Sequence, residues 1–366
     1  MGEVLDDMYN GQTPSRKRDE YWNGNIRWLS SGELNRGTVY SSIETITEEG
    51  KNSANLRVVP KGTFVMAITG LEASGTRGNC ALLGFDTTLN QSCMALFPKQ
   101  DILISQFLFQ WYRMVGEEYG INYTQGTKQQ SYNAELIKIL PILLPSIDEQ
   151  KKIASYLNSI DHLITLHQRK CEETKKLKKY MLQKMFPQNG QTVPEIRFAS
   201  FTDAWEQRKL GEVFKEYSEK GHTELPTLTI IQGGGTVKRE DSDRNLMYDE
   251  TNLSNYKMVR KDDFIVHLRS FEGGLEKASL DGIISPAYHT FHSDEADSRF
   301  YYPYFRSFEF IKHKLVPHVY GIRDGRSIDI EGMKSIEIPY TSLSEQRKIG
   351  DYLELLDHLI TLHHRK

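Results

Sequence analysis

Residues 149–170 read EQKKIASYLNSIDHLITLHQRK, and residues 345–366 read EQRKIGDYLELLDHLITLHHRK. Fifteen of these 22 positions are identical at a constant offset of 196 residues. This period is far too long for a solenoid, whose repeats run to about 50 residues. It indicates two similar halves, each with a variable globular part followed by one copy of the repeated segment.

Both copies are predicted to be helices. Each begins with an S-x-x-E capping box, at residues 146–149 and 342–345. Apolar residues then recur at alternating spacings of four and three, which is typical of a coiled-coil seam. Two equivalent seams in one chain would most simply pack on each other, antiparallel if a pseudo-twofold relates the halves. The seam positions are Ile153, Leu157, Ile160 and Ile164 in the first copy and Ile349, Leu353, Leu356 and Ile360 in the second.

The first helix is expected to run to Pro187, and roughly 40 residues at 1.5 Å each would give a rod of about 60 Å. The second copy has no counterpart of residues 171–186, and the first globular part lacks the AWEQRK lead-in that precedes Leu210 in the second. We therefore expect a chain shortened at both ends. The repeated histidines lie five residues apart, off a common helix face, so we interpret them as packing or surface residues. They are His162, His167, His358 and His363.

Composition bounds the class of protein. The 366 residues suffice for two or three domains with cores of their own. The net charge of −3 argues against general polyanion binding but allows a local basic face. The three cysteines form no CxxC, which favours a reducing compartment and no structural metal. No apolar run is long enough for a signal peptide or a membrane span, so we expect a cytoplasmic protein.

The two globular parts share little identity but keep parallel features. Gly2-Glu3-Val4 corresponds to Gly211-Glu212-Val213, and residues 59–64 correspond to residues 259–264 as a turn that enters a buried strand. We expect four regions: a first globular domain, a central helix, a second globular domain and a second, truncated helix. Their predicted ranges are 1–145, 146–187, 188–340 and 341–366.

Motifs for catalysis are missing from the sequence. It has no P-loop, no nucleophile elbow, no HExxH and no N-P-P-Y or D-P-P-Y methyltransferase motif. We expect residues 233–235, three glycines, to be a flexible turn, because no helix pattern follows them. Residues 272–277, EGGLEK, match a nuclease carboxylate–lysine set only loosely. Together with the duplication, this favours recognition over catalysis.

Several loops combine basic, amide and aromatic side chains. Arg and Lys suit guanine edges and phosphates, and Gln suits adenine. Each loop alone could equally be a solvated turn. The central helix carries nine Lys/Arg against five Asp/Glu over residues 147–187, which suits a phosphate backbone, a docking surface or a solvated face. The candidate DNA contacts are Arg16, Lys17, Arg18, Tyr21, Gln125, Thr127, Lys128 and Gln129 in the first part and Gln232, Arg269, Tyr320, Arg323, Arg326 and Ser327 in the second.

Five segments together resemble the specificity subunit of type I restriction–modification enzymes. They are GQTPSRKRDEYWNGNIRWLSSGEL at 11–34, LNQS at 89–92 with its positional partner IISPAY at 283–288, the segment from Leu144 through the first repeat to Pro187, and FTDAWEQRKLGEV at 201–213. The resemblance covers nearly the whole chain, and the two-copy helix is its most specific part. It adds Gln91 and Tyr288 to the candidate DNA contacts.

The resemblance implies an α/β (α+β) fold: two pseudo-symmetric mixed α/β target recognition domains joined by long helices that form an antiparallel coiled coil. Each domain is expected to read one half of a bipartite site in double-stranded DNA, and the helices to set the spacer. The helices are also expected to dock two modification (methyltransferase) subunits, which restriction subunits can join. S-adenosylmethionine, ATP and Mg would belong to these partners, and this chain is expected to carry no catalytic residue, cofactor or metal.

Two other functions are considered. The first is a duplicated protein-binding scaffold without sequence-specific DNA recognition, which predicts no salt-sensitive retardation of DNA. The second is a degenerate nuclease or methyltransferase half, which predicts activity of the isolated chain with metal or S-adenosylmethionine.

Overall fold

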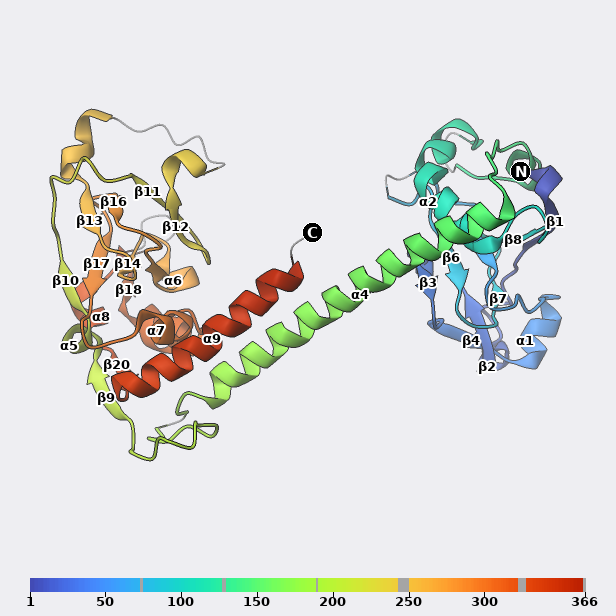
Figure 1. The fold of residues 1–366 in the computed structure, drawn as a ribbon. Coiled ribbons are helices and arrows are strands. Elements are labelled where there is room, and N and C mark those ends of the chain that lie inside the picture. Colours follow the sequence, from blue (N-terminus) through green and yellow to red (C-terminus); the bar gives the residue numbers. More distant parts are fainter. Residues whose placement is uncertain (73–74, 127–129, 189, 243–249, 322–326, 365–366) are drawn as a thin grey trace. The chain divides into compact units, whose positions relative to one another are not determined.

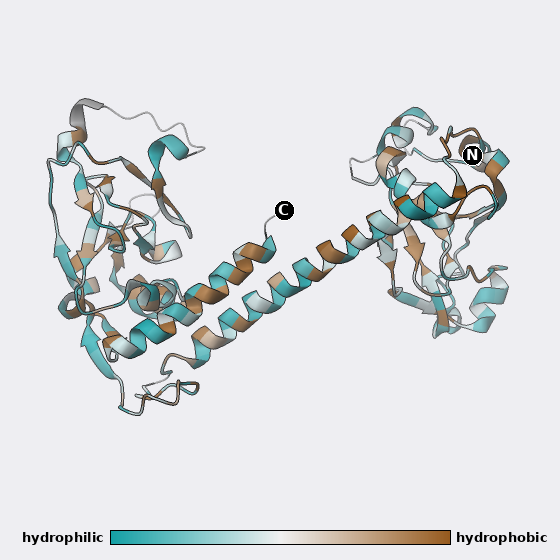
Figure 2. Cartoon of the chain, in the orientation of Figure 1, coloured by the Kyte–Doolittle hydropathy of each residue, from teal (hydrophilic) through white to brown (hydrophobic). Residues whose placement is uncertain are grey.

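The computed structural model describes residues 1–366 except 73–74, 127–129, 189, 243–249, 322–326 and 365–366 (Figure 1). The chain divides into two compact units, Met1–Ile164 and Thr165–Lys366. Each unit has its own apolar core. In Figure 2, hydrophobic and hydrophilic residues alternate along α9 (Leu343–His364), as expected of a helix that buries one face.

Unit 1 is built on a mixed sheet whose five described strands follow the order β1-β8-β5-β6-β3. The central strand β5 is buried along its whole length, which explains its uninterrupted apolar sequence FVMA. Helix α2 packs on this sheet, and the ring of Tyr112 meets the ring of Phe64 edge to face at 5.5 Å. The elements named are β1 (Leu5–Asn10), β8 (Cys93–Pro98), β5 (Phe64–Ala67), β6 (Cys80–Leu83), β3 (Thr38–Val39) and α2 (Ser105–Asn122).

A smaller sheet of order β4-β2-β7 lies in the same unit and buries Trp28 and Ile46. Its central strand β2 begins at Trp22, the last residue of the GQTPSRKRDEYW segment. The other elements of unit 1 are η1 (Gly2–Val4), η2 (Asp19–Tyr21), β2 (Trp22–Leu29), η3 (Ser31–Glu33), β4 (Glu44–Ile46), α1 (Glu48–Ser53), β7 (Thr88–Leu89) and α3 (Ala134–Lys138), together with the first part of α4 (Ile147–Lys184).

Unit 2 repeats the plan of unit 1. Its main sheet has the order β10-β17-β14-β15, and β14 pairs with β17 and β15 as β5 pairs with β8 and β6. The turn before each central strand is held in the same way. The amide of Lys61 donates to Asp86 at 2.8 Å, and the amide of Lys261 donates to Asp281 at 2.7 Å. The expected pair of similar mixed α/β folds is thus confirmed.

The elements of unit 2 follow the same logic of short strands and caps. Those up to β15 are β9 (Glu206–Lys209), α5 (Leu210–Val213), β10 (Lys215–Tyr217), β11 (Leu228–Ile231), β12 (Gly235–Lys238), η4 (Arg239–Asp241), η5 (Glu250–Asn255), β13 (Lys257–Val259), β14 (Phe264–Val266), α6 (Ser270–Gly273) and β15 (Glu276–Lys277). The others are β16 (Gly282–Ile284), β17 (His289–His292), α7 (Ser298–Phe305), η6 (Glu309–Leu315), η7 (Val316–His318), β18 (Val319–Tyr320), β19 (Ser327–Ile328), α8 (Ile330–Lys334), β20 (Glu337–Tyr340) and α9.

Within unit 2, α9 packs antiparallel to the C-terminal half of α4. The thiol of Cys171 lies 3.7 Å from the carbonyl of Ile360, and Lys178 forms an ion pair with Asp357. Nδ1 of His167 lies 3.0 Å from Nδ1 of His363. These two histidines are 196 residues apart, so they occupy equivalent positions of the repeat. The predicted antiparallel direction of the helices is confirmed.

The seam positions are divided between domain cores and the helix faces. Ile153 packs on the core of unit 1, while Ile349 and Leu353 lie in the core of unit 2. Ile160 and Ile164 are 36% and 50% exposed. Of the other three seam positions, Leu157 and Ile360 are half-buried, and Leu356 is buried.

A buried glutamine joins each repeated helix to its domain. Gln150 donates to the carbonyl of Ile102 at 2.8 Å and accepts from the amide of Ile104, which caps α2. Gln346 accepts at 2.9 Å from the amide of Asp297, which caps α7. Both glutamine side chains are fully buried, so these hydrogen bonds cannot be exchanged for water without cost.

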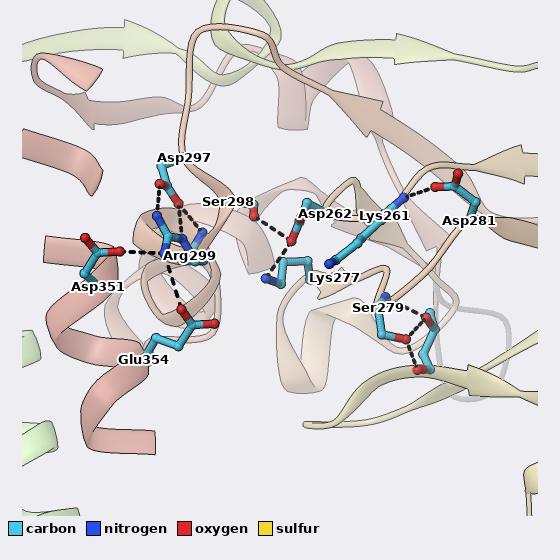
Figure 3. A network of polar contacts seen from close by, with 11 residues as sticks. Lys261, Asp262, Lys277, Ser279, Asp281, Asp297, Ser298, Arg299, Asp351 and Glu354 are labelled. Carbon is cyan, nitrogen blue, oxygen red and sulfur yellow. Dashed lines mark hydrogen bonds and ion pairs between the residues drawn. The ribbon is translucent and has the colours of Figure 1, made fainter. Parts of the chain in front are cut away.

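A polar network makes a second joint in unit 2 (Figure 3). Arg299 of α7 binds the carboxylate of Asp297 at 2.7 Å. The same guanidinium contacts two carboxylates of α9, Asp351 at 2.6 Å and Glu354 at 3.3 Å. One cation therefore connects the domain helix to two turns of the repeated helix.

We predict that Gln346→Ala lowers the free energy of unfolding by about 1–3 kcal/mol, because it leaves buried backbone groups of the α7 cap and the α9 start without partners. Denaturant unfolding measures this. The matched control is Arg347→Ala, the next residue on α9, whose side chain is exposed. Equal effects of the two substitutions would show that the glutamine joint contributes no more than a surface position.

Candidate nucleic-acid interface

One end of the main sheet of unit 1 gathers the loops that carry the predicted contacts. Asn10 at the end of β1 pairs with Met94 of β8, and Ala67 at the end of β5 pairs with Cys93. β6 begins at the same end, where Cys80 pairs with Met66 of β5. The segments that follow β1 and β5 and that precede β6 and β8 therefore leave the sheet side by side, the arrangement in which a rigid scaffold presents binding loops.

The structure brings Gln91 to the loop that follows β1. The side-chain amide of Asn10 donates to the carbonyl of Gln91 at 2.9 Å, and the hydroxyl of Thr13 donates to its side-chain oxygen. A Cβ built on Gly11 would lie 2.0 Å from the carbonyl oxygen of Leu89, so only glycine permits this approach. The two segments that the resemblance singled out, residues 11–34 and 89–92, thus form one surface.

Arg16 connects two tryptophan rings and a carboxylate within this surface. Its guanidinium lies 3.8 Å from the ring centroid of Trp22 and 5.1 Å from that of Trp28. It also forms a two-pronged ion pair with Glu44, with 2.8 Å between Nη2 and Oε2. The hydrogen bond between them raises the pKa of Arg16 and lowers that of Glu44. Because the carboxyl pKa is depressed on folding, this stabilisation is present above the ordinary value of about 4.3 and is lost as pH falls through the folded pKa.

The neighbouring cations differ in how they are engaged. Arg18 forms an ion pair with Glu20 at 3.1 Å. Lys17 is exposed and has no ion-pair partner among the residues that the structure describes. Tyr21 ends η2, and its carbonyl accepts a hydrogen bond from the amide of Thr47 at 3.0 Å. Of the charged side chains in this loop, Lys17 is thus the one best available to a phosphate.

Gln125 lies at the same end of the sheet. Its backbone exchanges two hydrogen bonds of 3.0 Å with Ser131, which in turn bridges to Thr69 beyond the end of β5. Three other predicted contacts, Thr127, Lys128 and Gln129, lie outside the described residues.

The corresponding end of the unit 2 sheet brings together three more predicted contacts. Val266 at the end of β14 pairs with His289 at the start of β17, so Arg269 and Tyr288 leave the sheet at the same end. A Cβ built on Gly273 would lie 2.5 Å from Nε2 of Gln232, so the Gln232 side chain lies directly against α6. The elements involved are α6 and the turn between β11 and β12.

Sequence reasoning missed His267, which lies between these residues. Its ring centroid is 6.1 Å from that of Tyr288, and Nδ1 accepts a hydrogen bond of 3.3 Å from the amide of Arg269. Burial lowers the pKa of His267, so the neutral imidazole is favoured. No local pattern marked it, since its role depends on Tyr288, which is distant in sequence.

The last predicted loop is described only at its two ends. Tyr320 of β18 pairs with Ser327 of β19. Arg323 and Arg326 lie outside the described residues.

The described part of the chain has neither a metal-binding cluster nor a membrane-spanning helix. Within it, no group of three or more His, Cys, Asp or Glu side chains is arranged to hold a metal ion. Over the same ranges, no helix combines the length and apolar character needed to cross a bilayer.

Comparison with known proteins gives a consistent family. The family model for the type I restriction modification DNA specificity domain matches residues 1–176 and again residues 202–366. The chain is 28% identical over 274 residues to the type I restriction enzyme MjaIX specificity subunit of Methanocaldococcus jannaschii, an alignment that covers 70% of this chain and 61% of that protein. It is 24% identical over 371 residues to the MjaVIII specificity subunit of the same organism, covering 96% of this chain and 84% of that protein.

A solved structure shares the fold. The crystal structure of the type I restriction–modification system S subunit from M. genitalium superposes with a TM-score of 0.59 at 15% identity, covering 99% of this chain and 89% of that one. The fold class expected from the sequence is thereby confirmed.

We predict that Lys17→Ala weakens binding to duplex DNA and reduces the slope of log K against log salt by about 0.9, the value for one phosphate contact in B-DNA. Thermal stability should stay unchanged, because the side chain is exposed. Arg16→Ala should instead lower stability, by about 1 kcal/mol for a largely exposed ion pair and cation–π contact. Titrations at several salt concentrations and thermal melts of both variants separate the two roles, and an unchanged salt slope for Lys17→Ala would remove Lys17 from the interface.

Proposed function

Since the chain belongs to the type I restriction modification DNA specificity family, whose model matches both of its halves, we propose that it is the DNA-recognition subunit of a type I restriction–modification complex. Residues 1–145 and 188–340 are the two target recognition domains. Residues 146–187 and 341–366 are the repeated helices. In this function the chain is non-catalytic and acts in the cytoplasm.

One observation carries the proposal: the same sheet end is used twice with different side chains. In unit 1 it gathers Gln91, Gln125 and the loop that carries Lys17, and in unit 2 it gathers Gln232, Arg269 and Tyr288. A common scaffold with different polar and aromatic groups suits two different base sequences, because base edges are distinguished by their donor and acceptor patterns. The proposed target is therefore bipartite and asymmetric.

The repeated helices would fix the distance between the two half-sites. α4 is one continuous helix of 38 residues, and within unit 2 it packs against α9. Two readers on a stiff connection bind together only when the half-sites are correctly spaced. One added base pair also rotates the second half-site by about 35°, since B-DNA has roughly 10 base pairs per turn. A helix pair of fixed length would therefore select DNA sites with one spacer length.

The chemistry would belong to partner subunits. We propose that the helices dock two modification subunits, which supply S-adenosylmethionine and methylate the target, and that restriction subunits with ATP and Mg join them. The buried joints at Gln150 and Gln346 support a rigid surface for such docking, because they tie each helix to its domain.

A domain exchange tests the function. Replacing residues 1–145 with the matching domain of a relative should change one half of the methylated motif and leave the other half and the spacer unchanged, because each domain reads alone. The measurement is single-molecule methylation sequencing of cells that express the chain with its modification subunit. The unexchanged chain is the control.

A change in both halves would show that readout is not modular. No sequence-specific methylation from the unexchanged chain, when it is soluble and bound to its partner, would favour the protein-binding scaffold.

A further inference from the structure

A buried carboxylate holds the triple-glycine turn between β11 and β12. Glu276 of β15 is completely buried. Its Oε1 accepts a hydrogen bond of 2.7 Å from the amide of Gly233, and its Oε2 accepts one of 3.1 Å from the amide of Gly235. The turn that the sequence analysis expected to be flexible is therefore fixed at two of its three amides.

The turn needs this support because its residues have little preference of their own. Gly233 and Gly235 have φ angles of +87° and +74°, a region that favours glycine. A Cβ on Gly235 would also lie 2.7 Å from the carbonyl oxygen of Lys277. Glycine gives the required close approach but loses the most conformational entropy on folding. The hydrogen bonds to Glu276 offset this loss of entropy and hold the turn in one conformation.

The Glu276 carboxylate accepts a hydrogen bond from a third donor, Tyr302, and an arginine donates to that tyrosine in turn. The hydroxyl of Tyr302 donates to Oε2 of Glu276 at 2.7 Å. Arg306 donates to the same hydroxyl at 2.9 Å, and its guanidinium lies 5.1 Å from the Tyr302 ring centroid. A buried carboxylate is tolerated only when donors surround it. This one is fully occupied in holding the turn.

The nuclease interpretation of EGGLEK loses its basis in these contacts. Both carboxylate oxygens of Glu276 are used, and Lys277 forms an ion pair with Asp262 at 2.9 Å. The structure also explains why the two residues are adjacent. Glu276 faces the turn, while Lys277 faces Asp262 on the other side. The hydroxyl of Ser298 donates to the Asp262 carboxylate at 3.2 Å.

The contact between Ser298 and Asp262 connects β15 to the helix that packs on α9. Ser298 precedes Arg299, which binds Asp351 and Glu354 of α9 (Figure 3). β15 therefore lies between the turn on one side and the helix joint on the other. The turn is fixed to the part of the unit that bears α9, and not only to its own hairpin.

At the tip of this fixed turn is Gln232. Its side chain is exposed and lies against Gly273 of α6, the helix whose N-cap is Arg269. Ile231, just before it, is 44% exposed although it ends a strand. A rigid exposed amide at the sheet end is suited to a bidentate contact with the N6 and N7 of adenine.

We propose that Glu276 is a positioning residue for base readout: it holds the 232–235 turn so that Gln232 selects one base pair in one half of the DNA target. This rests on the proposed function. Glu276 does not touch DNA, and an amide with one correct bidentate contact gives about 5- to 150-fold discrimination. That discrimination depends on the turn staying in place.

The test compares Glu276→Gln with Gln232→Ala in the full complex with its modification subunits. Glu276→Gln keeps the side-chain size but turns one acceptor into a donor that faces the turn amides or Tyr302. Both variants should relax selection at the same single position by about 5- to 150-fold and leave the other half-site unchanged. The readout is the methylated motif from single-molecule sequencing.

Glu240→Gln is the matched control. It makes the same change of charge on an exposed residue that follows the same hairpin. The motif of this variant should equal that of the unsubstituted chain.

Three results would overturn the inference. Glu276→Gln could lower methylation at all sites with the motif unchanged, which is the signature of a merely structural role. The two variants could relax different positions. Gln232→Ala, an exposed change that does not threaten folding, could leave every position unchanged. If the unsubstituted chain directs no bipartite motif, the proposed function itself fails, and that result is distinct from these three.

Discussion

The structure depends on one buried amide that is used twice. Gln150 and Gln346 each bind the backbone at the start of a domain helix, and neither side chain is reached by solvent. Because a buried amide that loses its partners costs about 1–3 kcal/mol, the first turns of the repeated helix cannot shift independently of the domain. Each domain therefore has a defined rotation about its helix. The direction in which each domain presents its surface is therefore set by its helix, and this is what allows a helix to act as a spacer.

The two domains stabilise their exposed loops by different means on the same topology. In unit 1 a surface arginine, Arg16, is stacked on Trp22 and paired with Glu44, so that it orders the loop that carries Lys17. In unit 2 the buried Glu276 orders a loop that contains no charge of its own. The scaffold is thus repeated while the loops and their supports vary. This is the pattern expected when the selection acting on each half concerns a different ligand sequence.

The sequence predicted the helices well because their signals are local. Capping boxes and the four-and-three spacing lie within a few residues of one another, and the repeat predicted that the two helices pack on each other, as His167 and His363 do. The supports of the loops were not predictable in this way. Glu44 is 28 residues from Arg16, and Glu276 is 43 residues from Gly233. Without the fold, three glycines indicate only flexibility, and a lone acidic residue near a lysine suggests catalysis.

The proposed function requires that two different DNA-reading domains are held at a fixed separation. Its most direct test is to incubate the chain and its modification subunits with a library of random duplex DNA and to sequence the bound fraction. Two short half-motifs at one fixed spacing are expected, and insertion of a single base pair between them should abolish the enrichment. A single contiguous motif, or two half-motifs whose spacing does not matter, would contradict this requirement.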